Sequence, residues 1–376
     1  MNLGDLIGQK VAAGILERAV KSGRLAHAYL FEGPEGVGKR TAALLLARAL
    51  KCEKSGCGTC IICRKIESGS HPDVRLIGPG DGAMAGASTE VLEALGERAN
   101  ISIDEVRQNP EKPRSIPPPL REDAYLKPYE GQWKVYVIDP ADRMSPEAAN
   151  ALLHLLEEPP GSVVLVLVTC RPDALLPTVV SRCQKVGFRL VPSREIEQAL
   201  ISTGIEEVTA RLLAALAEGR IGWALQTAGR PEWLETRARV LDWVAALPTS
   251  GVKAAIKRSS ELHELALDTW RSEAVHSAGF LAGEKLTQGQ MLRARLPMIF
   301  DIIAGWYRDA LILRSGHPGK AVNLDRLDLL REEAKRREAG FLAAALSRLM
   351  EAKSRLRRNA NPEITLDWLM LRLLPV

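Results

Sequence analysis

Short apolar runs alternate with helical stretches in the first half of the chain, and together they predict its fold. The runs lie at 28–32, 74–77, 135–138 and 163–168, and a final candidate strand lies at 185–190. Short, nearly continuous apolar runs are typical of strands buried on both faces of a parallel sheet. Helical patterns cover 40–50 and 146–158, and the second is stopped by Pro159 and Pro160. The pattern therefore predicts a nucleotide-binding α/β domain that ends near residue 190.

After residue 191 the strand signals stop and only helical patterns remain. Residues 193–228 read as short helices broken at Gly204 and Gly219, which together have the size of a small helical lid. From residue 230 onward nearly everything is helical, which favours a helical bundle. We therefore expect a multidomain protein, α/β followed by all-α, that divides into residues 1–190, 191–230 and 231–376.

One segment interrupts the sheet pattern. Residues 78–88 are rich in Gly and Ala, and residues 110–119 are rich in Pro, with a helical stretch between them. Long connections of this kind commonly leave the body of a domain. We expect residues 78–131 to form an extended excursion from the sheet, and the sequence leaves its purpose open.

Composition and charge narrow the class of protein. A length of 376 residues suits two or three domains, and 46% hydrophobic with 26% charged residues is ordinary for a globular chain. The net charge of +5 permits contact with nucleic acid without arguing for it. The N-terminus is amphipathic and contains acids, unlike a signal or transit peptide, and no apolar run is long enough to span a bilayer. We expect a soluble, cytoplasmic protein with no membrane contact.

Four of the six cysteines fall within twelve positions. They form the pattern C-x4-C-x2-C-x2-C, with Gly56 and Gly58 between them: Cys52, Cys57, Cys60 and Cys63. In a reducing compartment such spacing indicates a metal site rather than disulfides, and the alternative is free thiols. Close spacing lets one short loop wrap a tetrahedral ion, and no open coordination position is implied. The cluster therefore predicts a structural Zn²⁺ site.

Residues 33–40 read GPEGVGKR and match a phosphate-binding loop in every position except the last. The pattern needs Gly, four residues, Gly, Lys and then Ser or Thr. The candidate nucleotide-binding residues of this loop are Gly33, Gly36, Gly38, Lys39, Arg40 and Thr41. Backbone N–H groups of such a loop curl around phosphates, whereas the hydroxyl that is missing here normally holds Mg²⁺. The sequence leaves open whether ATP or ADP still binds without hydrolysis.

Two strand ends supply further candidates. Residues 135–138 are followed by Asp139, which in phosphate-loop proteins orients Mg²⁺ through its water shell, although an acid that closes a turn is the plainer alternative. The next residue is Pro140, which cannot act as a base, and Asp142 is a poor replacement. Thr169 ends the following strand, where it either contacts a γ-phosphate or is a satisfied hydroxyl.

Two basic features of the sequence are, by themselves, weak indications of a functional site. Arg182, in the sequence SRC at 181–183, follows a helical segment just before the last strand, and a lone Arg at such a place is usually a surface ion pair. The stretch 353–358 reads KSRLRR and is basic and helical, which favours a solvated helix face over a nucleic-acid contact.

Taken together, the motifs resemble those of the clamp-loader subunits of bacterial DNA polymerase III, which belong to the AAA+ ATPase class. The resemblance covers the whole of the first 190 residues. It rests on HAYLF at 27–31 before the phosphate loop, the cysteine insertion after the next helix, ANALL at 149–153, LEEPP at 156–160 and SRC at 181–183. The stretch LRRNANP at 356–362 is also similar to the collar domain of that family.

The resemblance implies an architecture and a set of partners. It implies a RecA-like AAA+ domain with a parallel sheet, a small helical lid and a C-terminal helical collar. The collar would assemble with gamma/tau and delta subunits into a five-membered ring, which opens the sliding clamp and places it on primed DNA.

Three departures from the motor subunits of that family are evident. Motor subunits have the complete loop, Asp-Glu after the strand and a sensor Arg in the lid, whereas this chain has Arg40, Pro140 and, by the resemblance, Gly222. The departures fit the delta-prime type of subunit, which has no ATPase activity of its own within the polymerase holoenzyme. By the resemblance, Arg182 is an arginine finger that acts in trans on a neighbour's nucleotide.

Two alternatives stay open. The chain is a hydrolysing gamma/tau-type motor if Thr41 or a water holds Mg²⁺ in place of the missing hydroxyl. It is a zinc-dependent DNA-binding module if the AAA+ body is vestigial and the cysteine cluster and basic stretch carry the function.

Overall fold

A computed structural model describes residues 2–79, 100–107, 118–247, 251–274 and 287–374. The described chain forms two compact units. Of the described residues, the first unit contains 2–79, 100–107, 118–203 and 217–225, and the second contains 204–216, 226–247, 251–274 and 287–374. The division at 1–190, 191–230 and 231–376 stays a prediction.

The first unit is built on a five-stranded parallel sheet in the order β2-β3-β4-β1-β5. The strands are β1 (Ala28–Glu32), β2 (Val74–Ile77), β3 (Lys134–Ile138), β4 (Val163–Thr169) and β5 (Gln184–Gly187). Every residue of β3 and β4 is buried, which explains why these runs are continuously apolar. Strand β5 ends earlier than the strand predicted at 185–190, because the chain leaves the sheet after Gly187.

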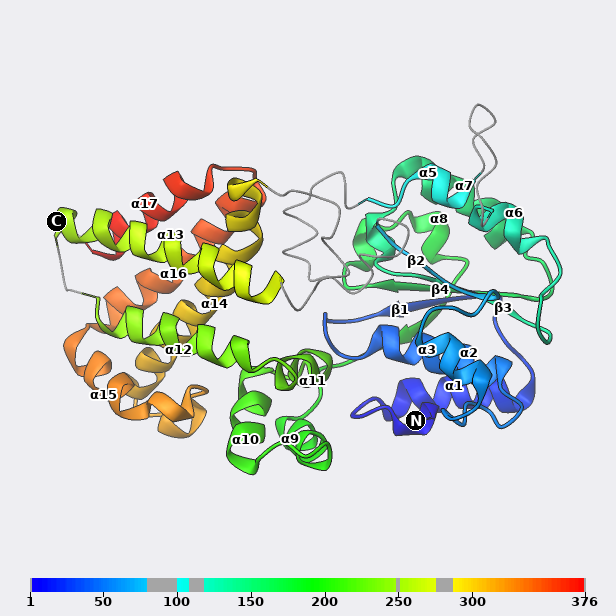
Figure 1. The fold of residues 1–376 in the computed structure, drawn as a ribbon, viewed down its shortest axis with the longest axis horizontal. Helices are drawn as coiled ribbons and strands as arrows, with labels where there is room; N and C mark the ends of the chain where they lie inside the picture. Colours follow the sequence, from blue (N-terminus) through cyan, green and yellow to red (C-terminus); the bar gives the residue numbers. More distant parts are fainter. Residues whose placement is uncertain (1, 80–99, 108–117, 248–250, 275–286, 375–376) are drawn as a thin grey trace. The chain divides into compact units, whose positions relative to one another are not determined.

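Helices cover both faces of this sheet (Figure 1). One face packs against α1 (Lys10–Ser22), α2 (Lys39–Lys51) and α3 (Ile61–Glu67). The other packs against α5 (Ile103–Val106), α6 (Leu120–Ala124), α7 (Pro146–Glu157) and α8 (Pro177–Val180). Alternate strand residues face the two layers: Val137 points to the first core and Tyr136 to the second. The predicted α/β class with a parallel sheet is confirmed.

Local signals in the sequence begin and end the key helices. Helix α7 starts where the Ser145 hydroxyl accepts a hydrogen bond from the Ala148 backbone, with Pro146 in the first turn. Three short helices follow the sheet, as predicted: α9 (Ser193–Ser202), α10 (Glu207–Leu216) and α11 (Ile221–Ala228). Most of the segments 78–88 and 110–119, with the helical stretch expected between them, lies outside the described residues.

The second unit is a helical bundle, which confirms the predicted all-α part. Its long helices are α12 (Pro231–Ala245), α13 (Val252–Ala274), α14 (Gln288–Arg314), α15 (Leu327–Arg336), α16 (Ala339–Arg357) and α17 (Pro362–Leu373). Helix α14 lies in the middle and contacts the other five. Its Phe300, Ile303 and Trp306 are fully buried in the core of the bundle. Among the described residues, no helix combines the length and apolarity needed to traverse a bilayer.

Candidate functional site

The phosphate loop lies between β1 and α2, where glycines give the backbone a conformation that other residues avoid. The φ angles of Gly33, Gly36 and Gly38 are +144°, +72° and +96°. A Cβ added to Gly33 would lie 2.4 Å from the carbonyl oxygen of Phe188, so the loop also needs glycine for space. Helix α2 then begins at Lys39. The strand, loop and helix that the motif predicts are all present.

The amine of Lys39 is turned back onto its own loop. Its Nζ donates hydrogen bonds to the carbonyl oxygens of Gly33 at 2.6 Å and Pro34 at 2.5 Å. The side chain is buried, and burial lowers the pKa of Lys39 against the opposing effect of Cys170 and Asp139. Here, then, the lysine stabilises the loop itself.

Arg40 places a second positive charge beside the strand-end acid. Its Nε lies 4.0 Å from Oδ2 of Asp139, which is 9% exposed. Burial raises the pKa of Asp139 to about 6, although the positive charges of Arg40 and Lys39 act in the opposite direction. The structure thus places Arg40, the extra cation of the loop, next to Asp139, the acid retained after β3. Thr41 lies on the exposed side of α2.

Thr169 and Asp142 bind each other. The Thr169 hydroxyl donates to Oδ1 of Asp142 at 2.7 Å and accepts a hydrogen bond from the backbone N–H of Arg171 at 2.9 Å. The Arg171 guanidinium donates to the other oxygen of Asp142 from Nε at 3.0 Å and Nη2 at 2.8 Å. The Thr169 hydroxyl therefore both donates and accepts a hydrogen bond within this chain. Arg171 was not evident from the sequence, because only the fold brings it to Asp142.

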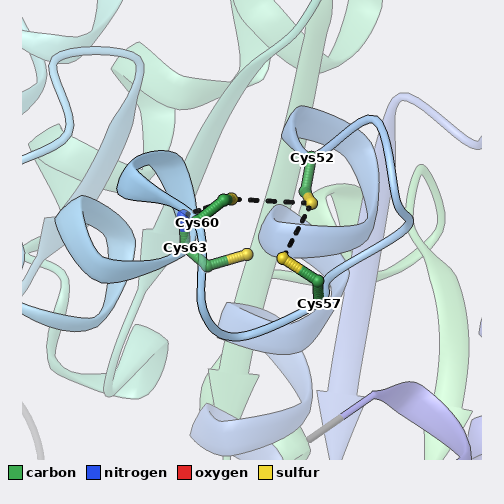
Figure 2. Close-up of side chains that lie close together, drawn as sticks. All are labelled: Cys52, Cys57, Cys60 and Cys63. Atoms are coloured by element: carbon green, nitrogen blue, oxygen red, sulfur yellow. Dashed lines mark hydrogen bonds between the residues drawn. The ribbon is translucent and has the colours of Figure 1, made fainter.

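The four cysteines converge at the end of α2 and the start of α3 (Figure 2). Their sulfur atoms all lie within 4.8 Å of one another, and the Sγ of Cys52 is 3.7 Å from those of Cys57 and Cys60. The loop between them turns through left-handed conformations at Ser55, Gly56 and Gly58, as the glycines in the motif predict. The cluster can hold one metal ion among four thiolates.

Hydrogen bonding inside the loop favours the thiolate form of Cys57. Cys60 caps α3, its sulfur accepting from the Cys63 backbone N–H at 3.4 Å. The backbone N–H and hydroxyl of Thr59 lower the pKa of Cys57 to about 5. Burial, with the neighbouring sulfurs, raises the pKa of Cys63 to about 12, and a cation among the sulfurs would reverse that effect.

A buried ion pair that is not evident from the sequence fixes the cysteine loop to the sheet. Lys51, the residue before Cys52, has its Nζ 2.8 Å from Oδ2 of Asp73 and donates to the carbonyls of Glu130 and Trp133. Asp73 also accepts from the backbone N–H groups of Tyr129 and Glu130. Lys51 and Asp73 are both buried, so each is the other's counter-charge.

His71 packs beside this pair. Its Nδ1 accepts a hydrogen bond from the Asp73 backbone at 3.1 Å, and burial is the main cause that lowers its pKa. The group of residues that can hold a metal ion among those described consists of the four cysteines and does not include His71.

Arg182 lies at the surface, 36% exposed in its side chain. Its Nη2 is 2.8 Å from Oε1 of Glu157, and its Nη1 donates to the carbonyl oxygen of Thr178 at 3.0 Å. Glu157 belongs to the LEEPP sequence at 156–160. The structure therefore connects two motifs that are far apart in the chain. Cys183, next to Arg182, is partly buried, and burial raises its pKa to about 12.

Two of the four basic residues in the stretch 353–358 form ion pairs with acids. Lys353 lies 2.7 Å from Asp301, and Arg355 lies 2.8 Å from Glu351 while its guanidinium stacks 3.9 Å above the ring of Trp368. These pairs favour the solvated helix face over a nucleic-acid contact.

Comparison with known proteins now identifies the family. Models of "DNA polymerase III, delta subunit" and of its C-terminal part match residues 8–192 and 284–374. The DNA polymerase III subunit delta' of Bacillus subtilis is 29% identical over 362 residues, which are 96% of this chain and 94% of that protein. The chain belongs to the DNA polymerase III delta-subunit family of clamp-loader proteins.

Other relatives of this clamp-loader chain are longer. The tau subunits of Bacillus subtilis and Escherichia coli are 31% and 34% identical over 231 residues, which are 59% of this chain. The chain spans 36% and 31% of the length of those two proteins. The crystal structure of a gamma subunit-related protein from Thermotoga maritima is 19% identical, covers 95% of this chain and 98% of its own, and has a TM-score of 0.42, too low to add to the assignment.

Proposed function

We propose that this clamp-loader subunit is of the delta-prime type and hydrolyses no ATP itself. The observation that carries the proposal is the approach of Arg40 to Asp139, at 4.0 Å. In a hydrolysing site, that acid faces a hydrated Mg²⁺. Here a guanidinium on the loop supplies positive charge beside the carboxylate, and Pro140 follows where a general base is needed. The match to the delta' subunit of Bacillus subtilis along nearly its whole length supports the same assignment.

The partners follow from the family. The chain would join gamma/tau and delta subunits in a ring through its helical unit, and the ring would load a sliding clamp on primed DNA with energy from ATP in the motor subunits. Any ATP or ADP in the retained loop would be a structural ligand, with Arg40 in place of the metal as counter-charge.

Arg182 is the proposed contribution of this subunit to catalysis. Its guanidinium has five N–H donors, and two contacts, with Glu157 and the Thr178 carbonyl, hold it at the surface. The remaining donors are available to a phosphate of a neighbouring subunit. An arginine finger stabilises the charge that develops on the transferred phosphoryl group, which is worth about 10³ to 10⁵ in turnover.

Structural Zn²⁺ is the proposed ligand of the four cysteines. Zn–S bonds of about 2.3 Å in a tetrahedron place the sulfur atoms about 3.8 Å apart. The separation of Cys52 from Cys57 and Cys60 is 3.7 Å, which fits. Four protein ligands leave no position for a reacting water, so the ion would hold the loop in shape and take no part in a reaction.

The test uses the reconstituted loader, with purified gamma/tau and delta subunits, clamp and primed DNA. The isolated chain should show no metal-dependent ATPase activity. Within the ring, Arg182→Ala should silence the nucleotide site that this subunit serves, lowering DNA-stimulated turnover and clamp loading. Arg211→Ala is a matched control, because Arg211 forms a similar exposed ion pair, with Glu207, at 3.3 Å. Robust ATP hydrolysis by the isolated chain would exclude the proposal.

A gamma/tau-type motor is the second candidate, favoured by the intact glycines, Lys39 and Asp139. Under that alternative, Lys39→Ala in this subunit alone should reduce turnover of the ring as strongly as the same change in a motor subunit. Under the delta-prime proposal it should leave turnover unchanged. The two outcomes separate the candidates with one variant.

A further inference from the structure

The segment 217–225, which contains the start of α11, lies directly on the phosphate loop. The backbone N–H of Gly222 donates a hydrogen bond to the carbonyl oxygen of Gly36 at 2.6 Å. Both residues belong to the first compact unit. Gly222 is also the position where the family resemblance places the sensor Arg of a motor subunit. The structure therefore shows a backbone contact where a motor is expected to place a long cationic side chain.

Glycine at both positions makes this contact sterically possible. A Cβ added to Gly222 would lie 3.0 Å from the Gly36 carbonyl oxygen, closer than side chains normally approach. A Cβ on Gly36, whose φ is +72°, would lie 3.1 Å from the Cβ of Arg220 and 3.6 Å from that of Trp223. The two backbones touch with no side chain between them, so neither glycine can be replaced without moving one segment away from the other.

A second contact holds the start of the same segment. The backbone N–H of Val191 donates to the Gly219 carbonyl oxygen at 2.8 Å. Gly219 has a φ of +90°, and a Cβ there would lie only 2.6 Å from the Cβ of Leu190. The chain that leaves β5 thus binds the segment just before α11. Residues 217–225 are attached to the sheet domain at two points.

The phosphate loop itself is also held by hydrogen bonds from other groups of the chain. Lys39 donates to the carbonyl oxygens of Gly33 and Pro34, as described above. The buried side-chain amide of Gln9 donates to the Val37 carbonyl oxygen at 3.3 Å and to that of Arg189 at 2.6 Å. The carbonyl oxygens of residues 33, 34, 36 and 37 therefore all accept hydrogen bonds from groups of this chain.

We propose that the Gly36–Gly222 contact is a latch that holds the segment 217–225 on the phosphate loop without nucleotide. In a motor subunit, a sensor Arg in the lid ties the lid's position to the phosphates that are bound. In this chain the backbone N–H at the same position donates a hydrogen bond to the loop backbone. This hydrogen bond does not require a bound nucleotide. The inference rests on the proposed function, because a lid held without nucleotide suits a subunit that does not cycle.

Hydrogen exchange on the full chain, followed by mass spectrometry, tests the latch. In the wild-type protein, peptides that cover 33–38 and 217–225 should be protected equally with no nucleotide, with ATP and Mg²⁺, and with ADP. In Gly222→Ala, the added Cβ should lengthen the contact, and exchange in both peptides should rise together by about tenfold. Peptides from β3 and β4 should stay unchanged, which shows that the variant is folded.

Gly14→Ala is the matched control. Gly14 lies inside α1, and a Cβ added there meets no atom within 4 Å, so exchange in both peptides should equal that of the wild type. Gly36→Ala breaks the same contact from the loop side and should reproduce Gly222→Ala. Should either variant fail to fold, the wild-type comparison with and without nucleotide still decides, since protection that rises on adding ATP overturns the latch.

The same samples separate failure of the latch from failure of the proposed function. Exchange in 33–38 that stays within twofold of wild type in Gly222→Ala overturns the latch alone. Steady ATP hydrolysis by the isolated wild-type chain overturns the proposed function. Protection that depends on nucleotide in a chain that hydrolyses none overturns the latch and leaves the proposed function standing.

Discussion

At the scale of single residues, Asp139 is a carboxyl group held where burial disfavours its charge. Its pKa is raised from 3.8 to about 6, so the folded protein binds a proton more tightly than the unfolded chain does. The stability that this group contributes is therefore fully present below about pH 4 and is lost as the pH rises through 6. The contacts with Lys39 and Arg40 reduce this cost without removing it.

Asp139→Asn should consequently gain stability relative to the wild type as the pH rises. The Asn side chain does not ionise, so the difference in unfolding free energy between the two proteins should shift in favour of the variant by about 2 kcal/mol from pH 4 to pH 7. Urea denaturation at several pH values measures the shift. A difference that is constant over this range would show that Asp139 ionises as an ordinary surface carboxyl group does.

Arg182 offers a second prediction at this scale. Its ion pair with Glu157 is partly exposed at both ends, with side chains 36% and 48% accessible. Exposed pairs contribute about 0–1 kcal/mol, so Arg182→Ala should leave the free energy of unfolding within about 1 kcal/mol of wild type. Denaturant titration of the isolated chain checks this. A loss well above 2 kcal/mol would mean that Arg182 is structural, and lost turnover in the ring would then have another explanation.

At the scale of elements, the turn between α16 and α17 shows how a short motif acquires a structural meaning. Asn359 in LRRNANP has a φ of +62°, and Asn361 caps α17 by accepting from the backbone N–H groups of Glu363 and Ile364. Arg293 from α14 donates to the carbonyl oxygens of Leu356, Asn359 and Ala360. The motif thus ends one helix, starts the next and attaches the turn to a third.

Arg293→Met should destabilise the helical unit by about 2 kcal/mol, because carbonyl oxygens at the end of α16 lose their donor. Arg331→Met is the control, since the Arg331 side chain is 56% exposed and its ion pair within the described residues is with Asp328, three residues earlier on the same helix. Its effect should be within about 0.5 kcal/mol. Equal free energies of unfolding for the two variants would show that the Arg293 contacts add nothing.

Elements were predictable from the sequence where a local signal defines them. The pattern placed β1 and β2 at their observed limits and α7 to within one residue, because a short, mostly apolar run marks a strand and a Ser-Pro start is a strong helix signal. It extended the last strand from Gly187 to residue 190, since Phe188 and Val191 are buried for another reason. Phe188 packs beside Gly33 of the phosphate loop, and Val191 packs beside Gly8, after the strand has ended.

At the scale of the whole molecule, the cysteine cluster is a local module on a sheet that has its own core. Lys51 and Asp73 anchor it from one side with side chains 1% and 0% exposed. The apolar cores on the two faces of the sheet do not depend on the sulfurs. Metal removal should therefore loosen the module without unfolding the domain.

Treatment with a strong chelator under reducing conditions should release one equivalent of Zn²⁺ per chain. Hydrogen exchange in residues 52–67 should then rise more than tenfold, while β3 and β4 stay protected. Metal analysis with mass spectrometry measures both. Cys57→Ser should lower the metal content, whereas Cys170→Ser should not, because Cys170 lies outside the cluster. A chain purified with no bound metal, or one that unfolds as a whole on chelation, would contradict this view.

The sequence by itself determined the order of elements, the phosphate loop, the cysteine cluster and the family, because each depends on residues that are close in the chain. A Gly-rich turn or a run of cysteines has much the same local geometry in any fold. Only the tertiary structure decided which distant groups meet: Arg40 with Asp139, Arg182 with Glu157, Lys51 with Asp73.

Gly222 shows the difference most clearly. The sequence shows only that Gly222 stands where the family resemblance places an arginine. The structure shows that its backbone N–H donates a hydrogen bond to the carbonyl oxygen of Gly36. A pattern of residue types records which side chain is absent. It does not record what approaches the space that this absence leaves, because that depends on the packing of segments nearly two hundred residues apart.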